Sequence, residues 1–594
     1  MTIKTPAADP RIDPLLAPVL QRRVESITKE MAEMLIRSSR SPIFNEIADL
    51  VAVVFDREGR MLGQTEYAAI IAFAAQPPLE YIIEYFGDDL ADGDVIIHND
   101  VYTRGNQNAD VGIYVPIFFD GELVAWSACK GHVADIGGST AGGYNPENVE
   151  IWQEAFRIPP LKIYEAGELR RDVWDLLGAN IRLEIVLEDF KAMVGACTVG
   201  KRRLIALLER YGLDVFQVHM DFVLESSERL VRAELERWPD GVYHGESWMV
   251  SDGIDPERRY RIAVEVRIEG SDITFDFSGS DDQAPGFTNM PPASAKAATR
   301  IALSMLLSAA GVDVPSNDGL FIPVTTVFRE GSLLNPRFPA ASVFGNQMVD
   351  EVLESIMMAL AEAMPDRVTA GWNQLLPIAL AGRDPRDCEL FVVLAVFQRG
   401  GAGAKLGADG WNMVGSPAAL QMRSPDPEMF ELTSPHVFEY CEFDTDSAGP
   451  GRWRGGLGLR SAFRTYGEPE HGTTHGDDVA LEGATPPPGL FGGHPGGLNT
   501  LLLEFPDGTK ANWGSKEHQP DLPPGTRVVA TNGGGAGYGD PRERPAELVL
   551  AEVRDGLISP AAARSEYGVA IDTGNWTVLE GETRTLRTIE RTGA

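Results

Sequence analysis

The chain has 594 residues, of which 43% are hydrophobic and 8% aromatic, as is usual for a globular protein with more than one core. It carries 52 Lys and Arg against 87 Asp and Glu, and the resulting net charge of −35 argues against binding to nucleic acid or to an anionic membrane. The four cysteines form no CxxC pair, which argues against a zinc ribbon and against a disulfide framework.

Neither a secretory signal nor a membrane span is expected. The first residues, MTIKTPAADPRIDP, contain no apolar run of the kind that a signal peptide needs. No window reaches the unbroken apolar length that a bilayer requires. We therefore expect a cytoplasmic protein.

The mixture of helical and strand patterns predicts an α+β protein built of successive regions. Glycine (62 residues) and proline (40 residues) are abundant, which favours tight turns and short strands over helical bundles. An arm, residues 1–13, precedes an N-terminal α+β region, residues 14–241, that carries the candidate site. Residues 242–375 form a central strand-and-helix region, residues 376–543 a glycine-rich β region, and residues 544–594 a helical tail.

Apolar spacing places the individual elements in chain order. Helical periodicity begins at Pro14 and returns in later stretches, whereas the strands are short apolar or alternating runs. Predicted helices cover 14–37, 75–86, 172–211, 216–237, 294–310, 346–364 and two short stretches within 545–568. Predicted strands cover the second half of 43–56, then 111–119, 123–129, 260–268 and 273–279.

Polar side chains crowd around a predicted hairpin whose turn is Asp120-Gly121. A hairpin brings its two ends together, so Gln107 and Asp110 should lie near His132 and Asp135. Loops at strand ends often carry function. The convergence of an imidazole with carboxylates predicts a metal or catalytic site.

Two other groups bear on this site. Asp49 stands at the start of the buried strand in 43–56, where a carboxylate is unusual, although a strand-entry residue at the surface fits the pattern equally well. His98 is a weaker candidate for the same pocket. His471 and His475 flank Gly-Thr-Thr beside Asp477 and Asp478, and because Gly and Thr disfavour a helix we predict a solvated loop there.

Glycine-rich loops at 400–404, 407–410, 452–458 and 531–541 invite a nucleotide-binding interpretation. However, no GxxxxGK[ST] is present, and no GxGxxG lies between a strand and a helix. Glycine loops in a β-rich chain are more often turns and bulges. We therefore expect no ATP site on this chain.

The hairpin segment resembles the hydantoinase B/oxoprolinase family. Members of that family show a Gly-Gly-Thr-His-Leu-Pro-Asp block, an Asp-Gly-Glu-Leu hairpin and a Gly-His-His-Ala-Asp-Ile-Gly-Gly block. The corresponding segments are RGNQNAD at 104–110, DGEL at 120–123 and GHVADIGG at 131–138. Two histidines of those blocks are replaced here, by Gln107 and Val133. The resemblance extends over nearly the whole chain.

The resemblance implies a single divalent metal, zinc or manganese, in the family's hydrolytic members. Its ligands correspond to Asp49, Gln107 and His132 in this sequence. Carboxylate and imidazole are good ligands for these metals, but the carboxamide of Gln107 is a poor one. The resemblance thus implies either a weakened metal site, which Asp110 could complete, or an empty one.

The resemblance also implies an ATP-dependent enzyme that works in a hetero-oligomer. Hydantoinases, oxoprolinases and caprolactamase open cyclic amides after phosphorylation, whereas acetone and acetophenone carboxylases join a phosphorylated enol to bicarbonate-derived CO2. In both groups an A-type partner subunit uses the ATP, and the B-type chain completes the second step.

Gln107 makes a ketone carboxylase the first expectation. Hydrolysis benefits from a metal-bound water of lowered pKa, whereas carboxylation benefits from excluding water. Asp110, His132 and Asp135 are then the expected acid–base or anchoring groups. Two alternatives stay open: a cyclic-amide hydrolase with a modified metal site, and a non-catalytic scaffold subunit, against which the retained Asp49, Asp110, His132 and Asp135 argue.

Overall fold

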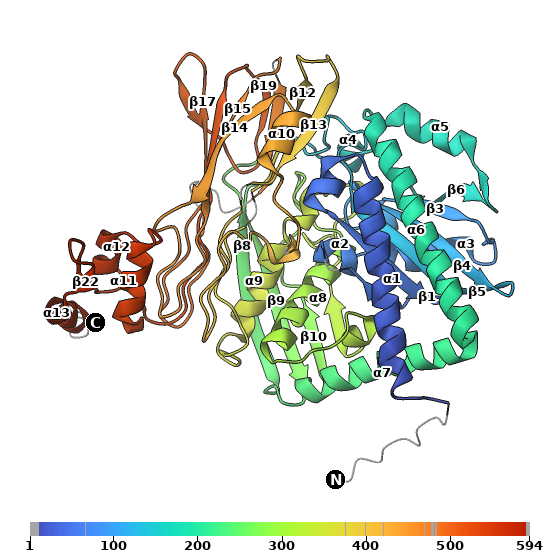
Figure 1. Cartoon of the computed structure of the whole chain (residues 1–594), viewed down its shortest axis with the longest axis horizontal. Coiled ribbons are helices and arrows are strands. Elements are labelled where there is room, and N and C mark those ends of the chain that lie inside the picture. The colour runs from blue at the N-terminus through green and yellow to red at the C-terminus, as the bar shows by residue number, and fades with distance from the viewer. Residues whose placement is uncertain are drawn as a thin grey trace, which may run out of the picture.

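The computed structural model describes residues 11–65, 67–374, 376–397, 399–419, 421–468, 470–476, 480 and 484–589. Both helices and strands occur along these residues, and the strands form several separate sheets (Figure 1). The predicted α+β class is therefore confirmed. Residues 1–10 of the predicted arm lie outside the described residues. No helix in the described part of the chain is both long enough and apolar enough to cross a bilayer.

A seven-stranded antiparallel sheet, with the order β2-β1-β5-β4-β3-β6-β7, forms the centre of the N-terminal region. Helices α1 and α6 lie across one face of this sheet (Figure 1). The strands are β1 (Leu50–Asp56), β2 (Met61–Gln64), β3 (Val95–His98), β4 (Asp110–Phe119), β5 (Glu122–His132), β6 (Leu161–Glu165) and β7 (Glu168–Leu169). The helices are α1 (Leu16–Ser38), α2 (Ala69–Phe73), α3 (Gln76–Phe86), α4 (Ile151–Glu154), α5 (Arg171–Asn180), α6 (Glu184–Tyr211) and α7 (Leu213–Leu235).

The long predicted helix over 172–211 is in fact two helices, α5 and α6, separated by residues 181–183. Within β1, alternate residues belong to two different cores, which explains why this strand is a continuous apolar run. Leu50, Ala52 and Val54 pack towards α1 and α6, and Val51, Val53 and Phe55 pack towards the core shared with the central region.

The central region is a four-stranded sheet with the order β11-β10-β9-β8, packed against α8 and α9. Its strands are β8 (Gly241–Val250), β9 (Arg259–Glu269), β10 (Asp272–Asp276) and β11 (Val324–Val327). The helices are α8 (Pro292–Ala309) and α9 (Val349–Leu360), which confirms both predicted helices apart from their ends.

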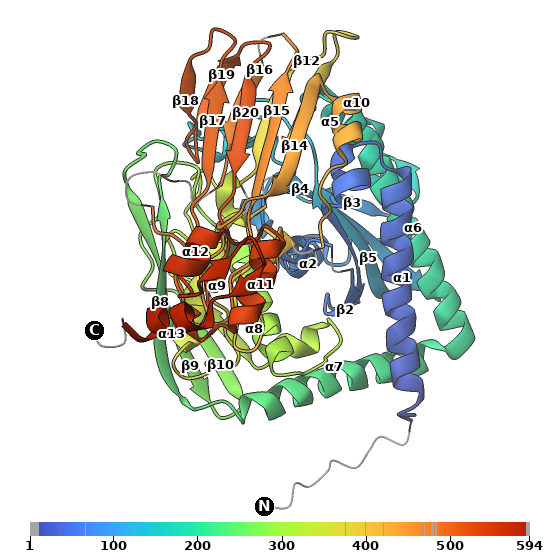
Figure 2. The same ribbon diagram turned by 60° about the vertical axis from the view of Figure 1, so that its left-hand side comes forward.

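Two further sheets stand together at one end of the molecule and enclose a small core (Figure 2). Their strand orders are β13-β12-β16-β19 and β14-β15-β20-β17-β18. The strands are β12 (Ile378–Arg383), β13 (Leu390–Ala395), β14 (His436–Phe443), β15 (Leu459–Thr465), β16 (Glu470–Thr474), β17 (Thr500–Glu504), β18 (Lys510–Asn512), β19 (His518–Leu522) and β20 (Arg527–Thr531), with helix α10 (Pro427–Thr433) between β13 and β14.

The glycine-rich segments are extended backbones that pack directly on one another. The amide of Gly456 donates to Ala402 O at 2.8 Å, and the amide of Gly535 donates to Gly456 O at 2.9 Å. A Cβ atom built on Gly455 would lie 1.8 Å from Gly535 O. Glycine is therefore required here for close approach between chain segments, and not only for the turns that we predicted.

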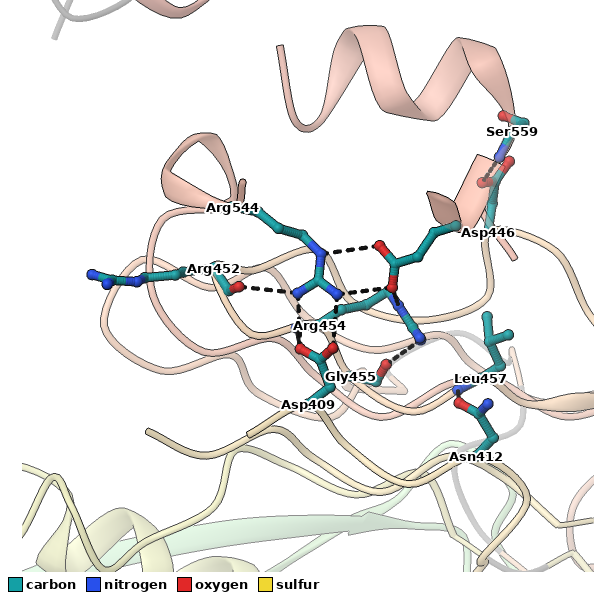
Figure 3. A network of polar contacts seen from close by, with 10 residues as sticks. Asp409, Asn412, Asp446, Arg452, Arg454, Gly455, Leu457, Arg544 and Ser559 are labelled. Carbon is teal, nitrogen blue, oxygen red and sulfur yellow. Dashed lines mark hydrogen bonds and ion pairs between the residues drawn. The ribbon is translucent and has the colours of Figure 1, made fainter. Parts of the chain in front are cut away.

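The tail contains α11 (Ala546–Arg554), α12 (Pro560–Ser565), a short hairpin of β21 (Ile571–Asp572) and β22 (Thr577–Val578), and α13 (Glu580–Ile589). The two short helices predicted within 545–568 are confirmed. Arg544 ties this tail to the glycine-rich segments (Figure 3), with Nη2 at 2.7 Å from Asp409 Oδ2 and Nε at 3.0 Å from Glu552 Oε2.

Candidate functional site

Strand register brings three of the predicted site residues together. The β4–β5 hairpin places Asp110 directly opposite His132. On the other side of β5, β1 pairs Leu50 with Gly131, and the amide of His132 donates to Asp49 O at 3.1 Å. Asp49, Asp110 and His132 therefore lie at the same end of three adjacent strands.

These residues line one cavity of about 70 Å³. Its polar wall also contains Tyr144, Asn346, Asp350 and His475, and its apolar wall includes Val396 and Met422. The cavity thus collects side chains from the seven-stranded sheet, from α9 and from the end of β16.

His132 and Asp110 form a buried pair, with Nδ1 of His132 at 3.0 Å from Oδ1 of Asp110. Burial is the largest single influence and disfavours both charged forms, but the hydrogen bond between the two groups and the neighbouring charges together outweigh it, so the pKa of His132 is raised and that of Asp110 is lowered. Asp110 Oδ2 accepts a hydrogen bond from Asn346 at 2.7 Å. Asp110 consequently fixes the imidazole and leaves Nε2 as the nitrogen available to a ligand.

Two further carboxyl groups in the cavity titrate close to neutral pH. Burial raises the pKa of Asp49 to about 6, with the charge of His132 opposing and that of Asp110 adding to the rise. Burial raises the pKa of Asp350 to about 7, although the hydroxyl of Ser416 donates to Asp350 Oδ1 at 2.6 Å. Groups with such values in a cavity are candidates for proton transfer.

Gln107 lies in the same cavity but its amide is already engaged. Its Nε2 donates to the hydroxyl of Tyr144 at 2.8 Å and to the carbonyl of Val343, and its Oε1 accepts from Asn346 at 3.0 Å. Oε1 keeps a second lone pair beside the hydrogen bond from Asn346, but a neutral carboxamide is a poor ligand for zinc or manganese. The donor set therefore offers a cation two ready protein ligands, the carboxylate of Asp49 and Nε2 of His132, where metal sites usually have at least three.

The structure does not bring Asp135 into the cavity. Its carboxylate accepts hydrogen bonds from the amides of Gly137 and Gly142, each at 3.0 Å, and from Arg182 at 3.0 Å. Asp135 thus holds the loop after β5 rather than facing a ligand. His98 is likewise turned elsewhere, with Nε2 at 2.8 Å from Thr103 Oγ1.

The predicted solvated loop around His471 and His475 is wrong. His471 lies within β16, and His475 directly after it is fully buried, with its ring stacked on Tyr144 at a centroid distance of 3.7 Å. A strand places Thr473 and Thr474 in register with β12, and this pairing draws His475 inward. Asp477 and Asp478 lie outside the described residues.

Among the residues that line the cavity, Asp350 is not predicted from the sequence, and His475 is predicted to lie in a solvated loop. For Asp350 a local signal exists, since an Asp-Glu pair interrupts an otherwise apolar helix start at Val349–Leu360. For His475 the local pattern is that of an ordinary strand end, and its place in the cavity depends on packing between distant segments.

The comparisons with known proteins agree with the resemblance. The family model described as hydantoinase B/oxoprolinase matches residues 13–541. The beta subunit of caprolactamase from Pseudomonas jessenii is 35% identical over 97% of this chain and 99% of its own length. The crystal structure of ATP-dependent caprolactamase from that organism superimposes with a TM-score of 0.88 at 34% identity, covering 97% of this chain and 99% of that one.

Two more relatives carry different names. The B subunit of a putative D-/L-hydantoinase from a Pseudomonas species is 31% identical over 94% of this chain and 96% of its own length. The acetophenone carboxylase delta subunit of Aromatoleum aromaticum is 26% identical over 98% of this chain and 89% of its own length. Hydrolase and carboxylase subunits are thus both among the proteins that this chain is similar to.

Proposed function

The chain belongs to the hydantoinase B/oxoprolinase family, and from this premise we propose that it is the subunit of an ATP-dependent enzyme that opens a cyclic amide. A partner subunit of the A type performs the ATP chemistry and delivers the activated amide to the cavity at the ends of β1, β4 and β5. The two relatives of higher identity, named as caprolactamase and hydantoinase subunits, support this choice over carboxylation.

The observation that carries the proposal is the fixed orientation of His132. Because Asp110 holds Nδ1, the lone pair on Nε2 is left to accept a proton from a water molecule. The water oxygen then bonds to the carbon of the phosphorylated amide and the carbon–nitrogen bond breaks, which leaves an acyl phosphate that a second water hydrolyses to the carboxylate and free phosphate. Asp110 stabilises the imidazolium that forms, and the proton passes on to the leaving nitrogen.

The two carboxyl groups with raised pKa complete this scheme. Asp350, whose pKa is about 7, retains a proton in part of the population and can donate it to the leaving nitrogen. Asp49, beside His132, orients the attacking water. Asp49 and Nε2 of His132 would hold a divalent cation only in place of the general-base role, because a metal-bound Nε2 has no lone pair left for a proton; the cation would then supply Lewis-acid activation of the water.

The test is an assay of the complex reconstituted with its A-type partner. With ATP and a panel of ε-caprolactam, hydantoin and 5-oxoproline, we expect one ring to be opened at a rate that His132→Ala lowers at least about 100-fold, the usual contribution of a general base. His494→Asn, on a half-buried histidine paired with Glu566, should leave the rate unchanged. Full activity of His132→Ala would instead indicate a scaffold subunit.

A ketone carboxylase is the second candidate, and Gln107 is the observation that favours it. The carboxamide is held by three hydrogen bonds and leaves the cation site one ligand short, which suits a reaction that does not need a metal-bound water. The same complex is therefore given acetone or acetophenone with bicarbonate and ATP. Fixation of labelled bicarbonate without opening of any cyclic amide would reverse the order of the two candidates.

A further inference from the structure

Lys130 is a buried cation that the proposed mechanism does not use. Its side chain is only 1% exposed, although lysine is almost never fully buried without a charged partner. No ion pair joins it to a carboxylate in the described part of the chain. Its ammonium group instead donates a hydrogen bond to the neutral oxygen Oδ1 of Asn106. A buried charge is costly, so groups beyond Asn106 must help to compensate it.

Strand geometry places Lys130 beside the pair of Asp110 and His132. Lys130 and His132 are two positions apart on β5, and alternate residues of a strand project from the same face. On β4, Gly112 lies opposite Lys130, and Asp110 lies opposite His132. Lys130 is therefore on the same face of the sheet as the pair, one step further from the strand ends.

The amide of Asn106 connects Lys130 to this pair. Its Nδ2 donates to Asp110 Oδ2 and, at 3.3 Å, to Asn346 Oδ1, while its Oδ1 accepts from Lys130. Oδ1 of Asp110 in turn holds His132 Nδ1 at 3.0 Å. All four side chains from Lys130 to His132 are buried. They form one continuous chain of hydrogen bonds that ends at the imidazole.

The charges at the two ends of the Asn106 amide fix its orientation. A flipped amide would turn Oδ1 towards the carboxylate of Asp110 and the NH₂ group towards the ammonium group of Lys130, and both contacts would be repulsive. Burial lowers the pKa of Lys130 to about 8, with the charge of Asp110 opposing the decrease, so the ammonium form predominates at pH 7. Lys130 thereby keeps the N–H of Asn106 directed at Asp110.

We infer that Lys130 and Asn106 are positioning residues that hold Asp110 in place for its contact with His132. Neither of them lines the cavity, so both act through Asp110 and not on the ligand. Lys130 orients the amide of Asn106, and this amide fixes the carboxylate that binds Nδ1. The inference rests on the proposed function for the role of His132 as a base, but not for the class of reaction.

Lys130→Met tests this inference, because methionine is similar in length to lysine but has neither its charge nor its donors. Oδ1 of Asn106 then loses its partner, and the amide no longer holds Asp110. For the complex with the A-type partner at pH 7, we expect kcat to fall by about 10–100-fold while KM changes less than about threefold. Lys130→Arg keeps the charge and the donors and should recover most of the lost rate.

A double-mutant cycle separates positioning from a general structural role. If Lys130 acts through Asp110, Lys130→Met should lower kcat no further once Asp110→Asn is present, whereas independent losses would multiply. Lys162→Met is the matched control. Lys162 is also buried in the seven-stranded sheet, where its Nζ lies 3.1 Å from Asp94 Oδ2, but it does not line the cavity. A folded Lys162→Met protein should keep its kcat.

The outcomes distinguish this inference from the proposed function. If Lys130→Met and Asn106→Ala fold and keep the wild-type kcat, or if their losses multiply with that of Asp110→Asn, the inference is overturned and ring opening by His132 stands. Full activity of His132→Ala overturns both.

If the complex carboxylates a ketone and opens no ring, the proposed function is overturned. The same cycle, measured on carboxylation, then decides the inference separately. Thermal unfolding shows which variants fold, and Asn106→Ala replaces Lys130→Met in the cycle if the methionine variant does not fold.

Discussion

At the scale of single residues, the activity depends on how Asp110 holds His132. Asparagine at position 110 could donate to Nδ1 and so fix the tautomer with the proton on Nε2, which cannot act as a base. We expect Asp110→Asn to lower kcat by roughly 10²–10⁴-fold with a smaller change in KM. Steady-state kinetics of the reconstituted complex measure both constants.

Asp135→Asn is the matched control for that experiment. Asp135 is also buried and belongs to the same predicted group, but it bonds to Gly137, Gly142 and Arg182 and does not line the cavity. A folded Asp135→Asn protein should keep its kcat. A loss as large as that of Asp110→Asn would return Asp135 to the catalytic group that the sequence predicts.

The metal question turns on Gln107. Replacing it with histidine adds an imidazole next to Asp49 and His132, so the site gains a third good ligand. We expect Gln107→His to bind about one zinc or manganese ion per chain more tightly than the wild type does. Gln107→Leu, which loses the same hydrogen bonds without adding a ligand, is the control, and elemental analysis after dialysis against each metal is the measurement.

A site residue could be predicted from the sequence where a local element places it, and could not where packing between distant segments places it. Asp110 and His132 face each other because one hairpin fixes their register, and the Asp120-Gly121 pair in the sequence predicts that hairpin. His475 comes from a strand of another sheet, and a pattern local to residues 470–476 contains no information about which distant tyrosine will cover it. Asp135 shares a motif with His132, yet backbone amides of its own loop take up its oxygens.

At the scale of elements, Glu154 at the end of α4 fixes the segment that leads to Asn346. Its Oε1 accepts from the amides of Ser342 and Val343, each at 2.7 Å, while Oε2 has no partner among the described residues. Burial raises the pKa of Glu154 to about 8, and the two amides only partly oppose this rise. The carboxyl group is therefore more easily ionised in the unfolded chain than in the folded one.

This difference in pKa gives the stability a definite pH dependence. Because the folded pKa is above the unfolded value, the contribution of Glu154 is fully present below about pH 4.5 and is lost as the pH rises through about 8. The loss amounts to about 1.4 kcal/mol for every tenfold difference between the two acid dissociation constants. Glu154→Gln cannot ionise and keeps the acceptor for both amides. We expect its melting temperature, relative to that of the wild type, to rise between pH 5 and pH 9.

Glu150→Gln, at the start of the same helix, is the control for the pH series. In Glu154→Gln the new side-chain amide nitrogen has no acceptor, and this lowers the melting temperature by the same amount at every pH. Only the change with pH of the difference in melting temperature from the wild type is therefore informative. A difference in melting temperature that stays flat from pH 5 to pH 9 would contradict the burial argument.

The glycine-rich segments illustrate what element patterns leave out. Their glycines predict turns, but the structure uses them to pack backbone on backbone, and spacing along one segment cannot reveal the neighbouring segment. The break between α5 and α6 is similar: periodicity continues through residues 181–183, whereas the chain departs from the helix there. Local patterns thus predicted which helices and strands exist. They did not predict where some of these elements end or which segments pack against each other.

Gly455 tests the packing of these segments. A Cβ there would lie 1.8 Å from the carbonyl oxygen of Gly535, so Gly455→Ala must force two backbones apart and should destabilise the protein by about 3 kcal/mol or more. Gly279→Ala is the control, since its Cβ would meet only the Ala263 side chain at 3.7 Å. Thermal unfolding compares the two, and equal melting temperatures would refute the need for glycine at position 455.

At the scale of the whole molecule, the cavity joins three of the predicted regions. Asp49 and His132 come from residues 14–241, Asp350 from residues 242–375, and His475 from residues 376–543. The polar wall is therefore complete only when the three regions are packed together. The tail, residues 544–594, contributes no described residue to the cavity and is attached at the far side of the glycine-rich segments (Figure 1).

Arg544 is the residue on which that attachment depends. Its side chain is only 1% exposed and pairs with Asp409 of the glycine-rich region and Glu552 of α11, which Arg454 also contacts at 3.0 Å. Removing the guanidinium leaves Glu552 with Arg454 alone and takes the charged partner from Asp409, whose side chain is 34% exposed, so the cost should be below the about 3–5 kcal/mol that is usual when a buried charge loses its only partner. Arg544→Ala should therefore release the tail by local unfolding, with faster hydrogen exchange in α11 and α12 and little change at the cavity.

Arg452→Ala, which removes an exposed pair with Glu543, should leave the exchange unchanged. Fast exchange in β4 and β5 of Arg544→Ala would show instead that the tail supports the site itself.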